Sequence, residues 1–426
     1  MERYLINYLK NVAVDPLVRK YVDYFKVELD WFIYNYGEQM AYRRDKEIPF
    51  RVQLREYKSL LKAHFDKVVF ENSNNNVLSS IPHKNFVDGI TAEGFNQYSS
   101  IFQPVGTQNV ISDRKALSIV LRKRKILRKG NFIDLYNKSF FQEIEDYKEL
   151  MREEYKKYNF RGLFLYTDEY FESKLLIEIF RSLNKPSFVF SHGLPGYYNL
   201  DTDNRTDYLM VWGERIKEMY LKTGFAQDKV FVVGNAKYKK VPKFSQLRNT
   251  YDDVLVIPVS SSWWHQHEWT EALIEDRSMI VLYLYEVQHV LQKIGIKHAR
   301  FRPHPSFEKE WVYSFLDHDF YSIDYEELNA SLSHTSLIVG ATSSVFLEAL
   351  MAGVNYVIFE PINEDTKTNL VRLALLPPFD GTDKGLEIAH TEDALLDLLR
   401  DKYEVDTAIL EGYIQPLDLS ILHELM

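Results

Sequence analysis

Apolar residues follow two patterns along this chain, short unbroken runs and longer stretches with helical spacing. Unbroken runs of about four to eight residues are typical of buried parallel strands, and apolar residues three and four positions apart indicate amphipathic helices. The two patterns alternate over residues 162–235 and again over 254–359, so the sequence predicts two α/β units. Strands are expected at 162–166, 187–190, 207–213, 229–235, 254–259, 299–302, 337–340 and 355–359, and helices at 171–183, 214–223, 279–294 and 392–399.

The remaining segments frame these two units. Residues 1–65 carry apolar residues at helical spacing among many charges, and 67–71 has the composition of a strand, followed by a polar turn at 72–76. Residues 236–251 are polar and lack periodicity, which favours a linker. We therefore expect an N-terminal Rossmann-like domain at 1–240 with a helical beginning, a second Rossmann-like domain at 250–400, and a helical segment at 401–426.

Composition narrows the class of protein. The 426 residues are 46% apolar and 15% aromatic, which excludes a disordered chain. A net charge of −9, from 52 basic and 61 acidic residues, argues against nucleic acid as a partner. The sequence has no cysteine, which excludes disulfides and thiolate metal ligands and is typical of a reducing compartment. No apolar run approaches the roughly 20 residues of a membrane span, so we expect a cytoplasmic protein.

Residues 114–129 form a strongly basic stretch in which apolar residues interleave with residues such as Arg122 and Lys123. Two interpretations remain open. The stretch could be a helix lying against an anionic surface, which would place the protein peripherally at the inner face of the membrane. A solvated helix is the favoured alternative.

Polar residues follow most of the predicted strands, at the point where open parallel sheets bind ligands. Loops far apart in the sequence converge at the carboxyl edge of such a sheet. In the second unit the candidates are Ser260, Ser261, Arg302, His304, Ser343, Ser344, Glu348 and Glu360, and in the first they are Asp168, Glu169 and His192. His304 lies between two prolines in Arg-Pro-His-Pro, which fix the backbone of its loop.

The stretch 337–354 is the most informative of these segments. A strand ending at Gly340 turns directly into a helix at Thr342-Ser343-Ser344, and the first N–H groups of a helix attract phosphate. A serine that merely caps the helix is an equally good interpretation. Neither the P-loop pattern Gly-x-x-x-x-Gly-Lys-Ser/Thr nor the dinucleotide pattern Gly-x-Gly-x-x-Gly occurs. The sequence therefore argues against a P-loop nucleotide site and against a dinucleotide-binding site, the two commonest functions of doubly wound sheets.

Two of these motifs resemble those of a known group of enzymes. Arg302-Pro303-His304-Pro305, followed by Ser343-Ser344, is similar to the His-Pro and Ser-Ser motifs of bacterial GT-B glycosyltransferases that use CMP-activated sugars, the sialyltransferases and Kdo transferases of capsule and lipopolysaccharide synthesis. Ser191-His192-Gly193, with the later Gly234-Asn235, also resembles the related CDP-glycerol glycerophosphotransferases of teichoic acid synthesis. The resemblance covers about residues 160–362.

The resemblance implies an α/β fold of GT-B type, with two Rossmann-like doubly wound domains facing each other across a cleft. It implies a glycosyltransferase that moves Kdo, sialic acid or a related acidic sugar from a CMP-sugar donor to a bacterial surface glycan or lipid-linked glycan, without a cofactor. The first domain would then be the acceptor side and the second would bind the nucleotide sugar. Two alternatives stay open: a CDP-glycerol-type glycerophosphotransferase, and a nucleotide-sugar-binding or epimerase-like protein without transfer activity.

The same resemblance implies roles in donor binding. His304 would contact the phosphate or ribose, Ser343 and Ser344 the phosphate, and Glu360 or Glu348 the ribose or base.

The catalytic group has several candidates. Many of the sialyltransferases carry an acidic pair followed by Gly as general base, and the first unit lacks this tripeptide. Asp168 and Glu169 are the best acidic candidates, as base or nucleophile, although Asp168 could instead cap the helix that follows it. His192 is either catalytic or a loop histidine bonded to backbone. The run His265-Gln266-His267-Glu268 lacks the His-Glu-x-x-His spacing, so no metal site is expected.

Overall fold

Two sheets of parallel strands organise the chain in this computed structural model, which describes residues 11, 15–25, 50–65, 73–103, 105, 109–111, 114–129, 138–168, 170–191, 205–222, 224–235, 237–238, 246–258, 278–303, 309–361 and 377–426. The seven-stranded sheet of the first domain has the order β3-β2-β1-β4-β5-β6-β7. The six-stranded sheet of the second domain has the order β10-β9-β8-β11-β12-β13. Both contain the 3-2-1-4-5-6 order of a Rossmann fold.

The strands are short, and most are buried. In the first sheet they are β1 (Asn76–Ser79), β2 (Asn96–Ser100), β3 (Asn109–Ile111), β4 (Gly162–Leu165), β5 (Ser187–Phe190), β6 (Tyr208–Val211) and β7 (Val230–Val232). In the second sheet they are β8 (Val254–Ile257), β9 (Ala299–Phe301), β10 (Tyr321–Ile323), β11 (Leu337–Gly340), β12 (Tyr356–Phe359) and β13 (Ile388–Ala389).

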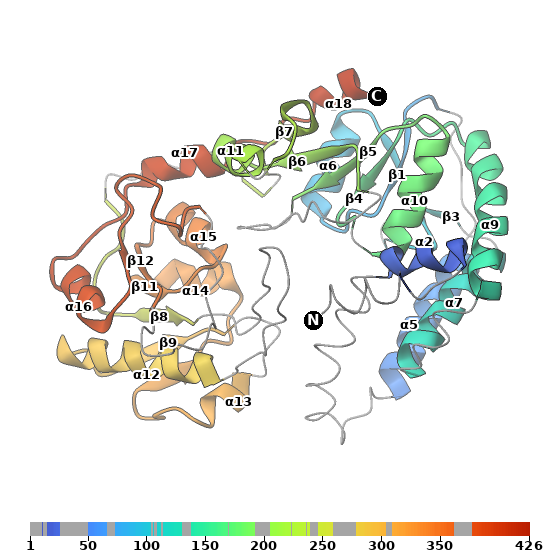
Figure 1. Ribbon diagram of the computed structural model, residues 1–426. Helices are drawn as coiled ribbons and strands as arrows, with labels where there is room; N and C mark the ends of the chain where they lie inside the picture. Colours follow the sequence, from blue (N-terminus) through green and yellow to red (C-terminus); the bar gives the residue numbers. More distant parts are fainter. Residues whose placement is uncertain are drawn as a thin grey trace.

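Helices connect and cover the strands, as parallel pairing requires. In the first domain they are α2 (Pro16–Tyr24), α5 (Phe50–Phe65), α6 (Lys84–Ala92), α7 (Arg114–Lys129), α9 (Lys138–Lys157), α10 (Phe171–Ser182) and α11 (Glu214–Lys222). In the second they are α12 (Ser278–Lys293), α13 (Lys309–Tyr313), α14 (Leu328–His334), α15 (Val345–Met351) and α16 (Glu392–Arg400). Figure 1 shows the two domains side by side.

The segment after α16 returns to the first domain. It contains α17 (Leu410–Tyr413) and α18 (Ile421–Leu425), which lie beside α11 and the first sheet (Figure 1). Its backbone binds there, because the N–H of Gln415 donates to the carbonyl of Trp212 at 3.0 Å. Gly213 and Gly234 allow this close approach, since a Cβ on either would collide with backbone atoms of the returning segment, and Gly234 also has a φ of +76°.

The predicted fold class is confirmed: the chain is α/β with two Rossmann-type doubly wound domains, the GT-B arrangement. The predicted strands at 162–166, 187–190, 254–259, 337–340 and 355–359 match β4, β5, β8, β11 and β12 within two residues at either end. The turn predicted at 72–76 is wrong at its end, because Asn76 begins β1 and pairs with Asn96. The strand predicted at 67–71 lies outside the described residues.

The basic stretch forms the predicted helix, α7, but it is not simply solvated. Lys123 is 5% exposed and donates to Glu172 of α10 at 2.6 Å. Arg122 pairs with Glu143 of α9 at 2.7 Å. These two side chains therefore hold α7 against its neighbours, because a buried lysine is stable only with a charged partner.

Candidate active site

The ends of β11 and β12 form one polar cluster at the carboxyl edge of the second sheet. Thr342 follows β11, and both its backbone N–H and its hydroxyl donate to the carboxylate of Glu360, which follows β12 and is 1% exposed. The hydroxyl of Ser343 accepts from the N–H of Val345 at 3.2 Å, and Ser344 is the N-cap of α15 without a side-chain bond. Both serines are partly exposed and directly follow Thr342, which binds the buried carboxylate.

Arg302 lies on the same edge, directly after β9. One terminal nitrogen of its guanidinium, Nη1, donates to Oδ2 of Asp324 at 2.6 Å and to the carbonyl of Glu326 at 2.8 Å. Asp324 is 2% exposed and also accepts from the hydroxyl of Ser331 at 2.8 Å. Burial opposes ionisation of Asp324, but the bonds from Ser331 and Arg302 outweigh it and hold the pKa of this carboxyl below its usual range.

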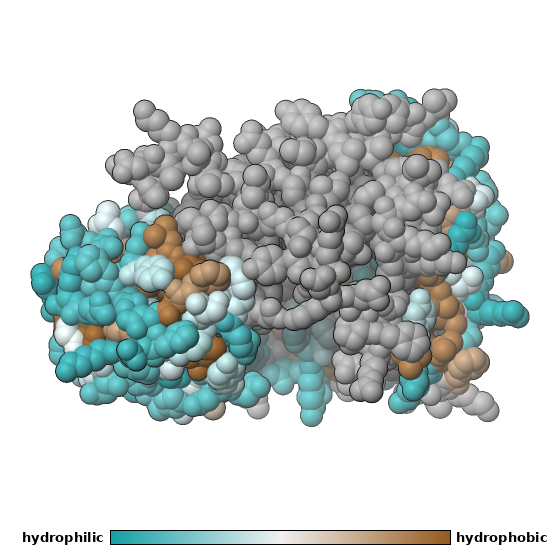
Figure 2. Space-filling view, turned by 90° about the horizontal axis from the view of Figure 1, so that it is seen from below, coloured by the Kyte–Doolittle hydropathy of each residue, from teal (hydrophilic) through white to brown (hydrophobic). Residues whose placement is uncertain are grey.

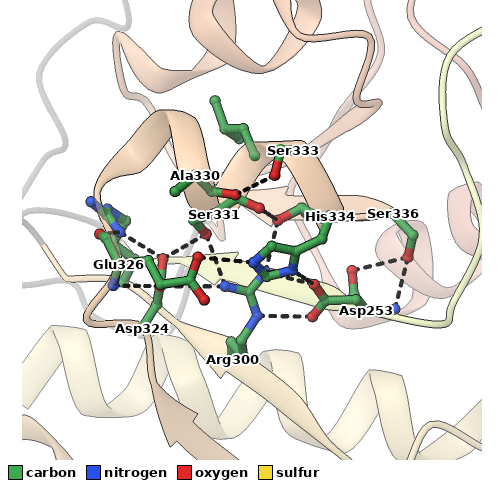
Figure 3. Close-up of polar contacts among 12 residues, drawn as sticks. Asp253, Arg300, Asp324, Glu326, Ala330, Ser331, Ser333, His334 and Ser336 are labelled. Carbon is green, nitrogen blue, oxygen red and sulfur yellow. Dashed lines mark hydrogen bonds and ion pairs between the residues drawn. The ribbon is translucent and has the colours of Figure 1, made fainter.

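A wider network supports the loop that holds Arg302. Figure 3 shows His334 of α14 between Asp253 and Glu326, with its two ring nitrogens 2.8 Å and 3.0 Å from their carboxylates. The bonds to Glu326 and Asp253 raise the pKa of His334. Arg300 of β9 donates from Nε and Nη2 to the two oxygens of Asp253 and from Nη1 to Ser331. The network thus connects Asp253, which precedes β8, with the loop after β10.

Asp168, a predicted catalytic residue, lies in the first domain and is buried. It is 1% exposed, and its Oδ2 accepts from Arg205 Nε at 2.9 Å and from the N–H and hydroxyl of Thr206 at 3.1 Å. Its Oδ1 lies 2.8 Å from Nη2 of Arg205. The helix-capping alternative is wrong, because Tyr170 is the N-cap of α10. Asp168 instead joins the loop after β4 to the segment before β6.

Three residues that the sequence did not single out lie in the loops after β1 and β4, where the strand order of the first sheet reverses. The loop after β1 and the loop after β4 are joined by a bond from the N–H of Tyr166 to the hydroxyl of Ser80, at 3.1 Å. The imidazole of His83 is exposed, and its ring centre lies 5.0 Å from that of Tyr166 at an interplanar angle of 60°. Burial raises the pKa of Tyr166.

Apart from Asp168, the predicted site residues divide into three groups. Ser343, Ser344 and Glu360 are brought together, and Arg302 lies on the same sheet edge, with the end of β8 between them. Glu348 of α15 forms an ion pair with Lys237, which follows β7, so it joins the two domains. Glu169, His192, Ser260, Ser261 and His304 lie outside the described residues, and their roles stay predictions.

Neither a metal cluster nor a membrane-spanning helix is found in the described ranges. No three His, Asp or Glu side chains gather there as metal ligands would, and the run at 265–268 lies outside these ranges. Among the described helices none is long and apolar enough to cross a bilayer. Seen from below, the described surface is largely hydrophilic with hydrophobic patches on both domains (Figure 2).

Comparison with known proteins finds similarity only among solved structures. No family model and no curated protein matches the chain. A protein from Listeria monocytogenes assigned as a UDP-N-acetylglucosamine 2-epimerase is 13% identical, with a TM-score of 0.44 over 81% of this chain and 91% of that one. A glycosyltransferase from Rickettsia africae is 12% identical, with a TM-score of 0.41 over 80% and 92%. MurG from Acinetobacter baumannii is 11% identical, with a TM-score of 0.41 over 82% and 98%.

These scores are too low to support an argument about activity. The fold assignment rests on the strand order of this chain.

Proposed function

We propose that this protein is a glycosyltransferase that binds a nucleotide-activated sugar at the carboxyl edge of its second sheet. The observation that carries the proposal is the arrangement of Arg302. Asp324 and the carbonyl of Glu326 hold Nη1, while Nε and Nη2 have no partner among the described residues. That edge of a guanidinium presents two parallel N–H groups, which is the geometry that binds a phosphate through two hydrogen bonds.

The neighbouring strand ends support the same proposal. Ser343 and Ser344 offer two hydroxyls on the edge that also carries Arg302, and open α/β sheets bind ligands where their strand order reverses, here between β8 and β11. Phosphate oxygens suit the arginine, and hydroxyls suit phosphate or ribose oxygens. Ser260, Ser261, His304, Glu348 and Glu360 are proposed to complete this donor site.

The proposed donor and acceptor rest on the resemblance of the Arg-Pro-His-Pro and Ser-Ser motifs to those of glycosyltransferases that use CMP-activated sugars. We propose a CMP-activated acidic sugar, Kdo, sialic acid or a relative, as donor, and a glycan or lipid-linked glycan of the bacterial surface, in capsule or lipopolysaccharide, as acceptor. Residues 1–240 are proposed as the acceptor side and 250–400 as the donor side.

Contact with the inner face of the membrane is a related proposal. Leu54, Leu61 and Phe65 of α5 are exposed, and Lys58 and Lys62 lie between them in the sequence. Apolar and basic side chains on one helix suit an anionic lipid surface.

Nucleotide release separates the proposal from its alternatives. The protein is incubated separately with CMP-sialic acid, CMP-Kdo, UDP-sugars and CDP-glycerol, each together with candidate glycan acceptors, and free nucleotide is measured. Release of CMP from CMP-sialic acid or CMP-Kdo supports a CMP-activated acidic sugar as donor. Release of UDP from UDP-sugars alone would contradict this donor, but the protein would still be a glycosyltransferase. Turnover of CDP-glycerol alone favours the glycerophosphotransferase, and no turnover favours the protein without transfer activity.

Binding by calorimetry tests the site itself. Arg302→Gln is expected to lower the affinity for CMP about tenfold or more, because a hydrogen bond to a charged group contributes about 1.5–3 kcal/mol. His304→Ala is expected to act in the same direction, and the double change Ser343→Ala with Ser344→Ala only partly, since backbone N–H groups remain. Unchanged CMP affinity in Arg302→Gln would remove this arginine from the site.

A further inference from the structure

The first sheet has its own point of strand reversal, and no site has been assigned to it so far. From β1 the chain passes through α6 to β2 on one side, and from β4 it passes through α10 to β5 on the other. A crevice between two such loops is the usual ligand position of an open α/β sheet. The loops meet closely, because the N–H of Ser80 donates to the carbonyl of Phe164 at 2.8 Å and that of Tyr166 to the hydroxyl of Ser80.

Among the described titratable groups of these two loops, only His83 is exposed and also has polar atoms without a described hydrogen-bond partner. Asp168 is buried, and both of its oxygens are bonded. Tyr166 is half-buried, and since burial raises its pKa, its hydroxyl stays protonated near neutral pH. His83 precedes α6 without capping it through its side chain, and its ring nitrogens have no hydrogen-bond partner among the described residues.

We propose that the acceptor sugar binds at this point of strand reversal and that His83 is the catalytic base that takes the proton of its attacking hydroxyl. The proposal rests on the glycosyltransferase function above. It supplies a base for a domain that lacks the acidic tripeptide and whose Asp168 is already bonded to Arg205. Imidazole suits the task, because its usual pKa lies close to neutral pH.

Transfer of the sugar needs only the two substrates, the nucleotide-sugar donor and the acceptor. The hydroxyl proton moves to an unprotonated ring nitrogen of His83 as the acceptor oxygen forms a bond to the anomeric carbon of the donor. The bond from that carbon to the phosphate oxygen breaks, and the nucleotide leaves with the electron pair on that oxygen. A single displacement inverts the anomeric configuration. The exposed ring of His83 and the partly exposed ring of Tyr166 lie next to each other, and on this proposal both would contact the acceptor sugar.

Turnover of the variant His83→Gln in the full chain tests the catalytic role. With CMP-sialic acid or CMP-Kdo as donor, kcat is expected to fall about a hundredfold or more, the usual scale of a general base, and the acidic limb of the pH–rate profile is expected to change. The CMP affinity measured by calorimetry and the melting temperature should stay at their wild-type values. His289→Gln, an exposed histidine paired with Glu392 in the second domain, is the matched control.

Three results would overturn the proposal: unchanged turnover in His83→Gln, a loss of CMP affinity equal to the loss of turnover, or a product with the donor's anomeric configuration by NMR. An array of bacterial glycans probed in the presence of CMP separates this proposal from the proposed function. Wild-type protein is expected to bind a subset of glycans and His83→Ala to lose them. Binding that survives in His83→Ala, or no binding by wild type, contradicts the acceptor site even when CMP is bound.

Discussion

The two points of strand reversal share a topology and differ in how each uses its carboxylates. At the edge of the second sheet, buried Asp324 and Glu360 bind groups that belong to that edge, the guanidinium of Arg302 and the N–H and hydroxyl of Thr342. At the edge of the first sheet, buried Asp168 binds Arg205 and Thr206, which precede another strand. The loops after β1 and β4 at this edge also carry a hydroxyl and two rings, those of Ser80, Tyr166 and His83.

This difference shows that strand order alone does not decide what an edge binds. An arginine that is held through Nη1 and has no described partner at Nε and Nη2 suits an anion, whereas an imidazole and a phenol suit a neutral hydroxyl compound. A nucleotide sugar and a sugar acceptor are such a pair of ligands. Asp324 and Asp168 contribute to the difference, because each neutralises, and thereby positions, a particular arginine.

The largest expected effect comes from removing the carboxylate of the first edge. Asp168→Asn leaves the guanidinium of Arg205 buried without its charged partner, so the free energy of unfolding should fall by about 3–5 kcal/mol. Chemical denaturation measures it, and Asp146→Asn on the exposed side of α9 is the control, with a change of about 0.5 kcal/mol or less. A fully stable Asp168→Asn protein without turnover would instead return Asp168 to the catalytic role predicted from sequence.

An intermediate effect is expected at the second edge. Asp324→Asn weakens the hold on Arg302, so the affinity for CMP should fall about tenfold, which calorimetry measures. Asp253→Asn is a matched control, because both carboxylates contact Arg300 and only Asp324 contacts Arg302. Equal losses of affinity in the two variants would show that Asp324 acts only through the stability of the domain.

The smallest effect concerns pH. His334 lies between Asp253 and Glu326 and next to Arg300, and the two carboxylates raise its pKa above the ordinary value of 6.5. A group whose pKa is raised on folding stabilises the fold below its unfolded pKa, and this stabilisation is lost as the pH rises through the folded pKa. His334→Gln should therefore destabilise the protein more at about pH 5.5 than at about pH 9. The difference should be small, since the imidazole is largely exposed, and an equal loss at both pH values would contradict it.

Much of the sheet architecture could be predicted because buried parallel strands are continuous apolar runs. Leu337–Gly340 and Val254–Ile257 are such runs, and both are strands in the structure. β2, with the sequence Asn-Gln-Tyr-Ser-Ser, has no such run, and it forms because β1 and β3 pair with it on either side. Tertiary pairing there overrides local composition.

Because local composition does not reveal tertiary pairing, several site residues were not predicted from the sequence. His83 follows β1, and because a turn was expected up to residue 76, it was not placed at a strand end. The tripeptide Ile81-Pro82-His83, two serines after the apolar pair Val77-Leu78, was the available signal. Asp324 follows β10, a strand of three residues. The partner of Asp168 is 37 positions further along the chain, so no local pattern could reveal that its carboxylate is bonded to Arg205.

The returning segment also bears on how the protein is made. Leu419 and Leu422 are almost fully buried in one hydrophobic cluster with Val77 and Phe164 of the first sheet. A ribosome synthesises the whole second domain before it reaches these two leucines. During translation the first domain therefore emerges with part of its core uncovered, and it reaches its final structure only after the second domain has left the exit tunnel.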